Sequence, residues 1–113
     1  MIITSIPQHP VVKDGLESRF RKSWEIAFRV ARMLREKYHA EDVRITGSLL
    51  HRERFHEESD IDLAVTNFTM PQAFDIEPEF EKYFPIKIDL IPLESVYPEK
   101  RDFILSRSET IGS

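Results

Sequence analysis

The sequence predicts an α+β domain, in which a small mixed sheet of three or slightly more strands is packed against helices. One long stretch repeats apolar residues at steps of three and four, which is typical of an amphipathic helix. Three short stretches alternate apolar and polar residues, which is typical of half-buried strands. These elements follow one another as helix-strand-helix-strand-helix-strand-helix, an order that favours helices packed on one sheet. Since the chain has only 113 residues, we expect a single domain over residues 1–113.

The first predicted helix covers about residues 15–39. Its main apolar stripe is formed by Leu16, Phe20, Trp24, Ala27, Ala31, Leu34 and Tyr38. A second stripe of Ile26, Val30 and Met33 leaves two interpretations open, because it can lie in the core or form a surface for a partner. We favour the core, since apolar periodicity in a helix mostly reflects burial against the rest of the domain.

Three strands are expected, over residues 43–46, 61–66 and 86–91. The first ends at a glycine and the third ends at Pro92, which cannot donate to a strand ladder. In the second strand Ile61, Leu63 and Val65 share one face, because successive side chains of a strand point to opposite sides.

Three shorter helices are predicted between and after the strands. The first runs from Ser48 to about Arg54. Residues 71–84 are expected to be helical at least over 79–84, because Pro78 interrupts the first part of that segment. The last helix runs from Pro98 to about Ser106, with its proline in the first turn, where no amide donor is needed.

Composition narrows the class of protein. The sequence has no cysteine, which excludes disulfides, thiolate metal sites and a cysteine nucleophile. No apolar run approaches the roughly 18 residues of a membrane span, and the first residues lack the basic and apolar regions of a signal peptide. We therefore expect a cytoplasmic protein without a membrane segment. The net charge of −4 argues against a polynucleotide partner, since such proteins usually carry a basic excess.

Three aspartates occupy positions where strands normally carry uncharged residues. Asp60 and Asp62 lie two residues apart and therefore project to the same side, and Asp89 alternates with the apolar residues of the third strand. If the second and third strands are neighbours, the three carboxylates converge on one face of the sheet. Hard oxygen ligands of this kind suit Mg²⁺, which takes substrate phosphates as further ligands. The alternative, solvated strand ends, is less favoured because apolar residues flank the aspartates.

A glycine and a serine follow the first predicted strand. Gly47 would let a ligand approach the backbone closely, and free amides at a helix start bind phosphate. Gly47 and Ser48 taken alone are more typical of a simple turn. Arg52 and Arg54 in the next predicted helix are candidate contacts for a triphosphate, and their alternative is a solvent-facing position.

The combined pattern resembles a known family. Gly47-Ser48, then eleven residues, then Asp60-Ile-Asp62-Leu-Ala-Val65 is similar to the signature of the DNA polymerase β-like nucleotidyltransferases. The short chain is most similar to the minimal nucleotidyltransferases (MNT), single-domain proteins paired with HEPN-domain proteins in toxin–antitoxin modules. The resemblance implies a palm-like nucleotidyltransferase fold. It differs from the usual pattern in two ways. The gap between Ser48 and Asp60 is one residue longer than the commonest spacing, and Leu49 stands where the family often has a basic residue, with no second glycine in the run that follows to Arg54.

The resemblance also implies roles for individual residues. Gly47 and Ser48, with Arg52 as the preferred basic contact, would bind the nucleotide. Asp60, Asp62 and Asp89 would be the catalytic carboxylates and would hold two Mg²⁺ ions. ATP would be the substrate, and the reaction would transfer a nucleoside monophosphate with loss of pyrophosphate.

Two functions of different classes follow. In the first, the chain is a Mg²⁺-dependent nucleotidyltransferase that moves AMP from ATP to a hydroxyl of a HEPN-domain partner and acts as an antitoxin. In the second, it is a non-catalytic subunit that binds a nucleotide or a partner and masks a HEPN protein. The departure at Leu49 and Leu50 favours the second reading, and the three intact aspartates favour the first. We also expect the helix over 15–39 and the segment over 97–111 to dock the partner.

Overall fold

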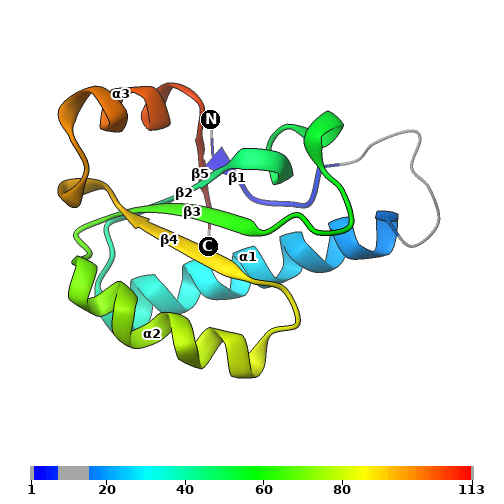
Figure 1. Cartoon of the computed structure of the whole chain (residues 1–113), viewed down its shortest axis with the longest axis horizontal. Helices are drawn as coiled ribbons and strands as arrows, with labels where there is room; N and C mark the ends of the chain where they lie inside the picture. Colours follow the sequence, from blue (N-terminus) through cyan, green and yellow to red (C-terminus); the bar gives the residue numbers. More distant parts are fainter. Residues whose placement is uncertain (1, 8–15, 113) are drawn as a thin grey trace.

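A computed structural model of the chain describes residues 2–7 and 16–112. It contains one five-stranded mixed sheet with helices on both faces (Figure 1). The helices are α1 (Leu16–Tyr38), α2 (Met70–Tyr83) and α3 (Pro98–Ser106). The strands are β1 (Ile2–Ile3), β2 (Asp42–Thr46), β3 (Ile61–Thr66), β4 (Ile88–Pro92) and β5 (Glu109–Ile111). Three short 3₁₀ turns are η1 (Gly47–Leu49), η2 (Arg52–Arg54) and η3 (Leu93–Ser95).

The strands lie in the order β1-β5-β2-β3-β4. β3 is antiparallel to β2 and parallel to β4, so the three predicted strands are neighbours at the centre and one edge of the sheet. β5 extends the sheet antiparallel to β2, and β1 pairs in parallel with β5. The α+β class and the mixed sheet are confirmed, and two short strands that the sequence pattern did not predict enlarge the sheet.

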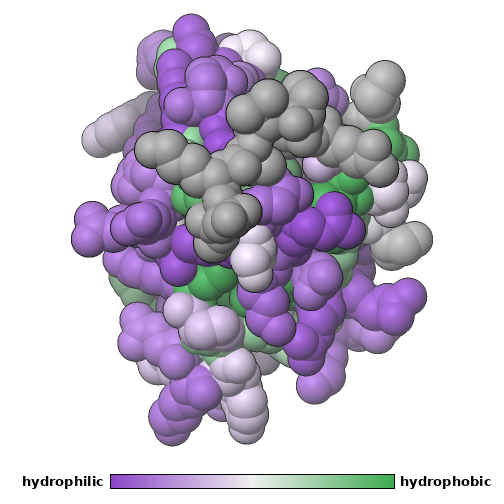
Figure 2. Space-filling view, turned by 90° about the vertical axis from the view of Figure 1, so that its right-hand side faces the viewer, coloured by the Kyte–Doolittle hydropathy of each residue, from purple (hydrophilic) through white to green (hydrophobic). Residues whose placement is uncertain are grey.

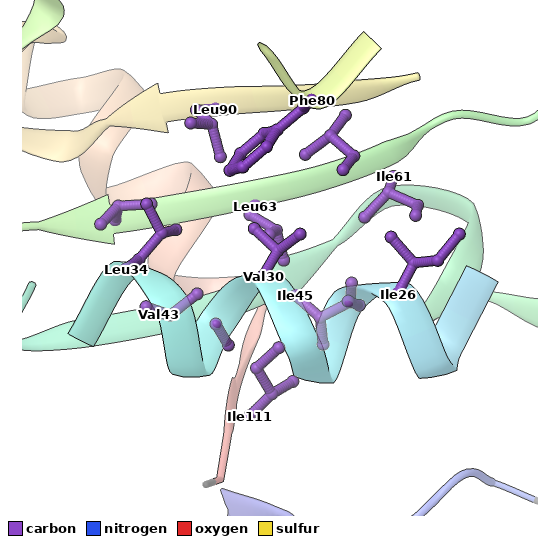
Figure 3. Close-up of a cluster of buried hydrophobic side chains, with 14 of the residues drawn as sticks. Ile26, Val30, Leu34, Val43, Ile45, Ile61, Leu63, Phe80, Leu90 and Ile111 are labelled. Carbon is purple, nitrogen blue, oxygen red and sulfur yellow. The ribbon is translucent and has the colours of Figure 1, made fainter. Parts of the chain in front are cut away.

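α1 and α2 cover one face of the sheet, and α3 lies on the other (Figure 1). Both apolar stripes of α1 enter the core, since Ile26 and Val30 are almost completely buried. Figure 3 shows Ile26 facing Ile61 and Val30 facing Leu63 of β3. The interpretation of the second stripe as core is therefore correct, and the expectation that α1 docks a partner through it is wrong.

The prediction that Pro78 interrupts a helix is wrong. The helix is continuous from Met70 to Tyr83, with Pro78 inside it. Pro78 has no amide, so the Phe74 carbonyl loses its usual partner four residues later. Both residues are exposed, so water satisfies that carbonyl without breaking the helix. A capping box formed by Thr69 and Gln72 fixes the helix start.

Two further predictions are corrected at element ends. The helix expected from Ser48 to Arg54 is instead the two separate turns η1 and η2, because His51 adopts non-helical backbone angles between them. The third predicted strand begins at Ile88 rather than Ile86 and includes Pro92. Pro92 is tolerated because β4 is an edge strand. The outward amide of Leu90 in that edge donates to Glu77 Oε2 of α2 at 3.2 Å.

A smaller apolar cluster holds α3 on the opposite face, where Ile104 packs with Ala64 of β3 and Leu93. Arg44 of β2 fixes the end of this helix. Its Nε donates to Ser108 Oγ at 2.8 Å, its Nη2 donates to the Ser108 carbonyl at 3.0 Å, and its Nη1 donates to Thr110 Oγ1 at 3.0 Å. Among the described residues, no helix is long and apolar enough to cross a membrane.

Candidate active site

A polar row crosses the face of the sheet that carries α3. Thr46 of β2 pairs with Asp62 of β3, and Asp62 pairs with Asp89 of β4. All three residues are half-buried, while the alternate residues of the same strands point into the apolar core. The condition under which Asp62 and Asp89 meet, adjacent strands in matching register, is therefore fulfilled. We call Thr46, Asp62 and Asp89 the acidic row.

The carboxyl groups of Asp62 and Asp89 are in hydrogen-bonding contact. Burial, the charges of Asp89 and Asp60 and this contact together raise the pKa of Asp62 from 3.8 to about 6, with burial the largest cause. Lys87 acts in the opposite direction, and its Nζ lies 3.7 Å from Asp89 Oδ1. The acidic row thus carries negative charge that the neighbouring protein groups compensate only in part.

Asp60 lies just before β3 rather than inside it. The preceding residue is fixed in place, since Arg19 Nη2 donates to the Ser59 carbonyl at 2.9 Å and the His56 amide donates to Ser59 Oγ at 2.8 Å. Asp60 is half-buried and close enough to Asp62 to raise its pKa. Asp60 therefore borders the acidic row from the start of β3.

Gly47 is required by the geometry of the acidic row. Its φ of +75° lies in the left-handed region that residues with a side chain rarely adopt. A Cβ built on it would lie 2.5 Å from Asp62 Oδ2, so any side chain at this position would force the Asp62 carboxylate to move. The Leu50 and His51 amides both donate to the Gly47 carbonyl at 3.1 Å, which closes the turn. Gly47 is thus a turn residue and also gives space to the Asp62 carboxylate, while Ser48 follows it half-buried in η1.

The two basic residues after Gly47 differ, because Arg52 packs on aromatic rings and Arg54 faces solvent. The guanidinium of Arg52 lies 5.0 Å from the centre of the Phe20 ring and 5.7 Å from that of Phe55, and its buried Nε has no hydrogen-bond partner. Arg54 is exposed.

The side of the molecule on which α1 and β3 begin is mostly hydrophilic, with apolar side chains visible only in small areas (Figure 2).

Sequence reasoning missed two groups near the aspartates, namely the end of α3 and the side chain of Lys87. Thr46 Oγ1 lies 3.5 Å from the Arg107 carbonyl, which brings the end of α3 to the acidic row. Lys87 supplies the nearby cation. The alternation of Thr46 with Val43 and Ile45 already indicates that Thr46 faces away from the core. No local pattern marks Arg107, because its position depends on how α3 packs.

Carboxylate oxygens and a partly compensated charge fit a hard divalent cation. Among the described residues, no three His, Cys, Asp or Glu side chains are grouped so that they could hold a metal ion by themselves. The expected convergence of three carboxylates is thus seen as one contacting pair with Asp60 beside it. Mg²⁺ is usually bound by one or two carboxylates together with substrate phosphates rather than by an all-protein cage. The Asp62–Asp89 pair, with the Gly47 turn beside it, matches that mode of binding.

Comparison with known proteins identifies the fold. No protein-family model and no curated protein matches the chain. Seven chains of solved structures are similar to it, among them the following three. A toxin–antitoxin structure with AMP-PNP superposes with a TM-score of 0.63 at 17% identity, over 74% of this chain and 70% of that one. A protein assigned as a minimal nucleotidyltransferase gives 0.59 at 22% identity, over 82% and 92%. A Sulfolobus solfataricus protein assigned as a nucleotidyltransferase gives 0.59 at 15% identity, over 90% of both chains. The chain therefore has the minimal nucleotidyltransferase-like fold.

Proposed function

We propose that this protein transfers a nucleoside monophosphate from a nucleoside triphosphate to a hydroxyl group. The observation that carries the proposal is the contacting carboxyl pair of Asp62 and Asp89 beside the Gly47 turn, on a fold shared with nucleotidyltransferases. Gly47 and Ser48 would receive the phosphates, and Asp60, Asp62 and Asp89 would be the catalytic carboxylates. Arg52 is offered as a further phosphate contact, which requires it to leave its position over Phe20 and Phe55.

The reaction is a displacement at the α-phosphorus. The acceptor oxygen forms a bond to that phosphorus, the bond from the phosphorus to the oxygen shared with the β-phosphate breaks, and pyrophosphate leaves with the electron pair. Asp89 takes the proton of the acceptor hydroxyl. Two Mg²⁺ ions held by Asp60, Asp62 and Asp89 with the phosphates would neutralise the charge on the reacting oxygens. Gly47 and Ser48 would position the phosphates relative to Asp89, so the residues of this chain set the line of attack.

We further propose that ATP donates AMP to a partner protein of the HEPN type and that this protein is an antitoxin. Support comes from the similar toxin–antitoxin structure, which contains AMP-PNP. Another similar structure is the toxin–antitoxin MntA-HpeT. The small domain offers few surfaces that could hold an acceptor, and a partner would complete the site. Exposed Tyr97, next to α3, and Leu105, on α3, are candidates for that contact. A cytoplasmic location stays a prediction.

The test is transfer of label from α-labelled ATP to the product of the neighbouring reading frame in the presence of Mg²⁺. Wild type should label this protein, and Asp62→Asn and Asp89→Asn should each reduce labelling at least about 100-fold, since each removes a carboxylate from the reacting site. Asp75→Asn, an exposed substitution on α2, is the matched control and should label normally. Pull-down should show all variants bound to the neighbour. Full labelling by both acidic-row variants would contradict the proposal.

A second candidate function is a non-catalytic subunit that masks its partner. The position of Arg52 over two aromatic rings and the buried Leu49, where the family often has a basic residue, favour it. In this case the acidic-row variants would neutralise the neighbour as well as wild type does. A growth assay with the neighbour co-expressed therefore separates the two functions.

A further inference from the structure

We propose that Phe103 and Arg107 of the α3 end form the surface against which the base of the nucleotide stacks. This inference rests on the proposed function, because it adds a base-binding subsite to the site that would hold the phosphates. Nothing in the sequence pattern or in the resemblance points to these two residues.

The end of α3 is held firmly beside the acidic row. The Arg107 carbonyl lies 3.5 Å from Thr46 Oγ1, and Thr46 pairs with Asp62. β2 is flanked by β3 on one side and by β5, which begins two residues after Arg107, on the other, so Thr46 of β2 lies between the Arg107 backbone and Asp62. The hydrogen bonds of Arg44 to the carbonyl and hydroxyl of Ser108 fix the residue that follows Arg107.

The two flanks of α3 have different surroundings. Ile104 points to the sheet, where it is buried with Ala64. One flank carries Arg101, which donates to the Leu93 carbonyl at 2.8 Å and thus faces η3. Residues 103 and 107 are four apart and lie together on the opposite flank, since side chains repeat every 3.6 residues. That flank is turned away from η3, and its last residue reaches the acidic row.

The pair has the chemistry of a base-stacking surface. The guanidinium of Arg107 lies 4.6 Å from the centre of the Phe103 ring. Phe103 is nevertheless 57% exposed, so the stack leaves an aromatic surface open to solvent. Aromatic rings and planar guanidinium groups are the surfaces on which proteins stack bases. The guanidinium of Arg107 also adds a positive charge to this surface, which suits a ligand that carries phosphates.

α2 provides a matched control. Phe74 is 67% exposed on α2, which packs on the other face of the sheet. Phe74 and Phe103 are therefore alike in residue type, in exposure and in lying on a helix, and they differ in position relative to the acidic row. An effect of Phe103 that arises merely from an exposed aromatic ring would be shared by Phe74.

The test compares two ligands by titration calorimetry in the presence of Mn²⁺: ATP, which has a base, and tripolyphosphate, which has none. Phe103→Ala should weaken ATP binding about tenfold, because base stacking contributes about that factor, and should leave tripolyphosphate binding unchanged. Phe74→Ala should change neither ligand. Equal ATP binding by wild type and Phe103→Ala would overturn the subsite alone, and an equal loss for both ligands would assign Phe103 to the phosphates or the fold. Failure of wild type to bind either ligand would overturn the proposed function together with the subsite.

A second variant tests the proposed subsite without removing the aromatic side chain at position 103. Phe103→Trp places an indole in the proposed subsite, and the one native tryptophan, Trp24, is fully buried and gives a constant background. ATP should quench the new emission on binding, and tripolyphosphate should not. An emission that tripolyphosphate quenches equally, or that ATP leaves unchanged while calorimetry shows it bound, would contradict the inference.

Discussion

The two faces of the central strands are built from alternating residues of the same short segments, yet they have opposite chemistry. Towards α1 and α2, Ile45 and Leu63 are completely buried among apolar side chains. Towards α3, Asp62 is placed where burial and neighbouring carboxylates raise its pKa to about 6. Burial of the apolar face stabilises the folded state, whereas burial of the carboxylate on the other face destabilises it. Stability and candidate chemistry therefore come from different sides of one strand, and substitutions on one side can change one property without the other.

The largest expected effect comes from removing a side chain from the apolar face. Leu63→Ala should lower the free energy of unfolding by about 3 kcal/mol, because it leaves a cavity in a fully buried position of β3. Urea unfolding followed by circular dichroism measures this change. Asp62→Asn, at the adjacent position of β3 on the acidic row, is the control, and it should not lower the free energy of unfolding. If the two substitutions cost the same, the separation between the faces is wrong.

A substitution at Gly47, in the η1 turn that follows β2, should lower the free energy of unfolding by a smaller amount. Gly47→Ala should cost about 2 kcal/mol, because φ of +75° is unfavourable for alanine and the new Cβ would press on the Asp62 carboxylate. Shortening Asp62 to alanine in the same chain should recover part of this cost, and a double-mutant cycle measures that part. If Gly47→Ala costs the same with and without the carboxylate, the contact with Asp62 has no energetic effect.

The smallest effect, and the one of opposite sign, is expected for Asp62→Asn. The pKa of Asp62 is higher in the folded protein, about 6, than its ordinary 3.8, so ionisation at neutral pH opposes folding. Below the lower pKa the carboxyl is protonated in both states and costs nothing, and the cost is complete above pH 6. After allowance for solvent screening, Asp62→Asn should stabilise the protein by about 1 kcal/mol at pH 7.5 and by almost nothing at about pH 3.

Unfolding free energies at the two pH values check this prediction. The control Asp75→Asn removes an exposed carboxylate on α2, away from the acidic row, and should follow wild type at both values. A stabilisation by Asp62→Asn that does not depend on pH would mean that it arises from something other than the ionisation of Asp62.

Alternation along a strand made the central part of this structure predictable. β3 begins and ends at the residues expected from Ile61, Leu63 and Val65, and α3 begins at Pro98 as predicted. The meeting of Asp62 with Asp89 was predictable only on the condition that β3 and β4 are neighbours, since strand pairing is not written in a local pattern. The structure fulfils that condition.

The remaining features depend on tertiary contacts. β5 has three residues, too few for a visible alternation, and it forms because β2 and the Arg44 side chain bind it. Pro78 is tolerated because the carbonyl it deprives faces water, which requires knowledge of which side of α2 is exposed. Arg52 lies over Phe20, a residue more than thirty positions earlier, and no spacing rule within one segment detects such a contact. The subsite proposed at Phe103 likewise depends on packing.

The hydrogen bond from the Leu90 amide to Glu77 has a consequence for how this protein meets other molecules. β4 is a sheet edge, and an edge with free amides invites a strand of another chain to pair with it. Here a carboxylate of α2 occupies the Leu90 donor, and Pro92 at the end of the strand has no donor. The opposite edge, β1, is only two residues long. At both described edges the sheet is therefore a poor template for strand addition and for the aggregation that follows from it.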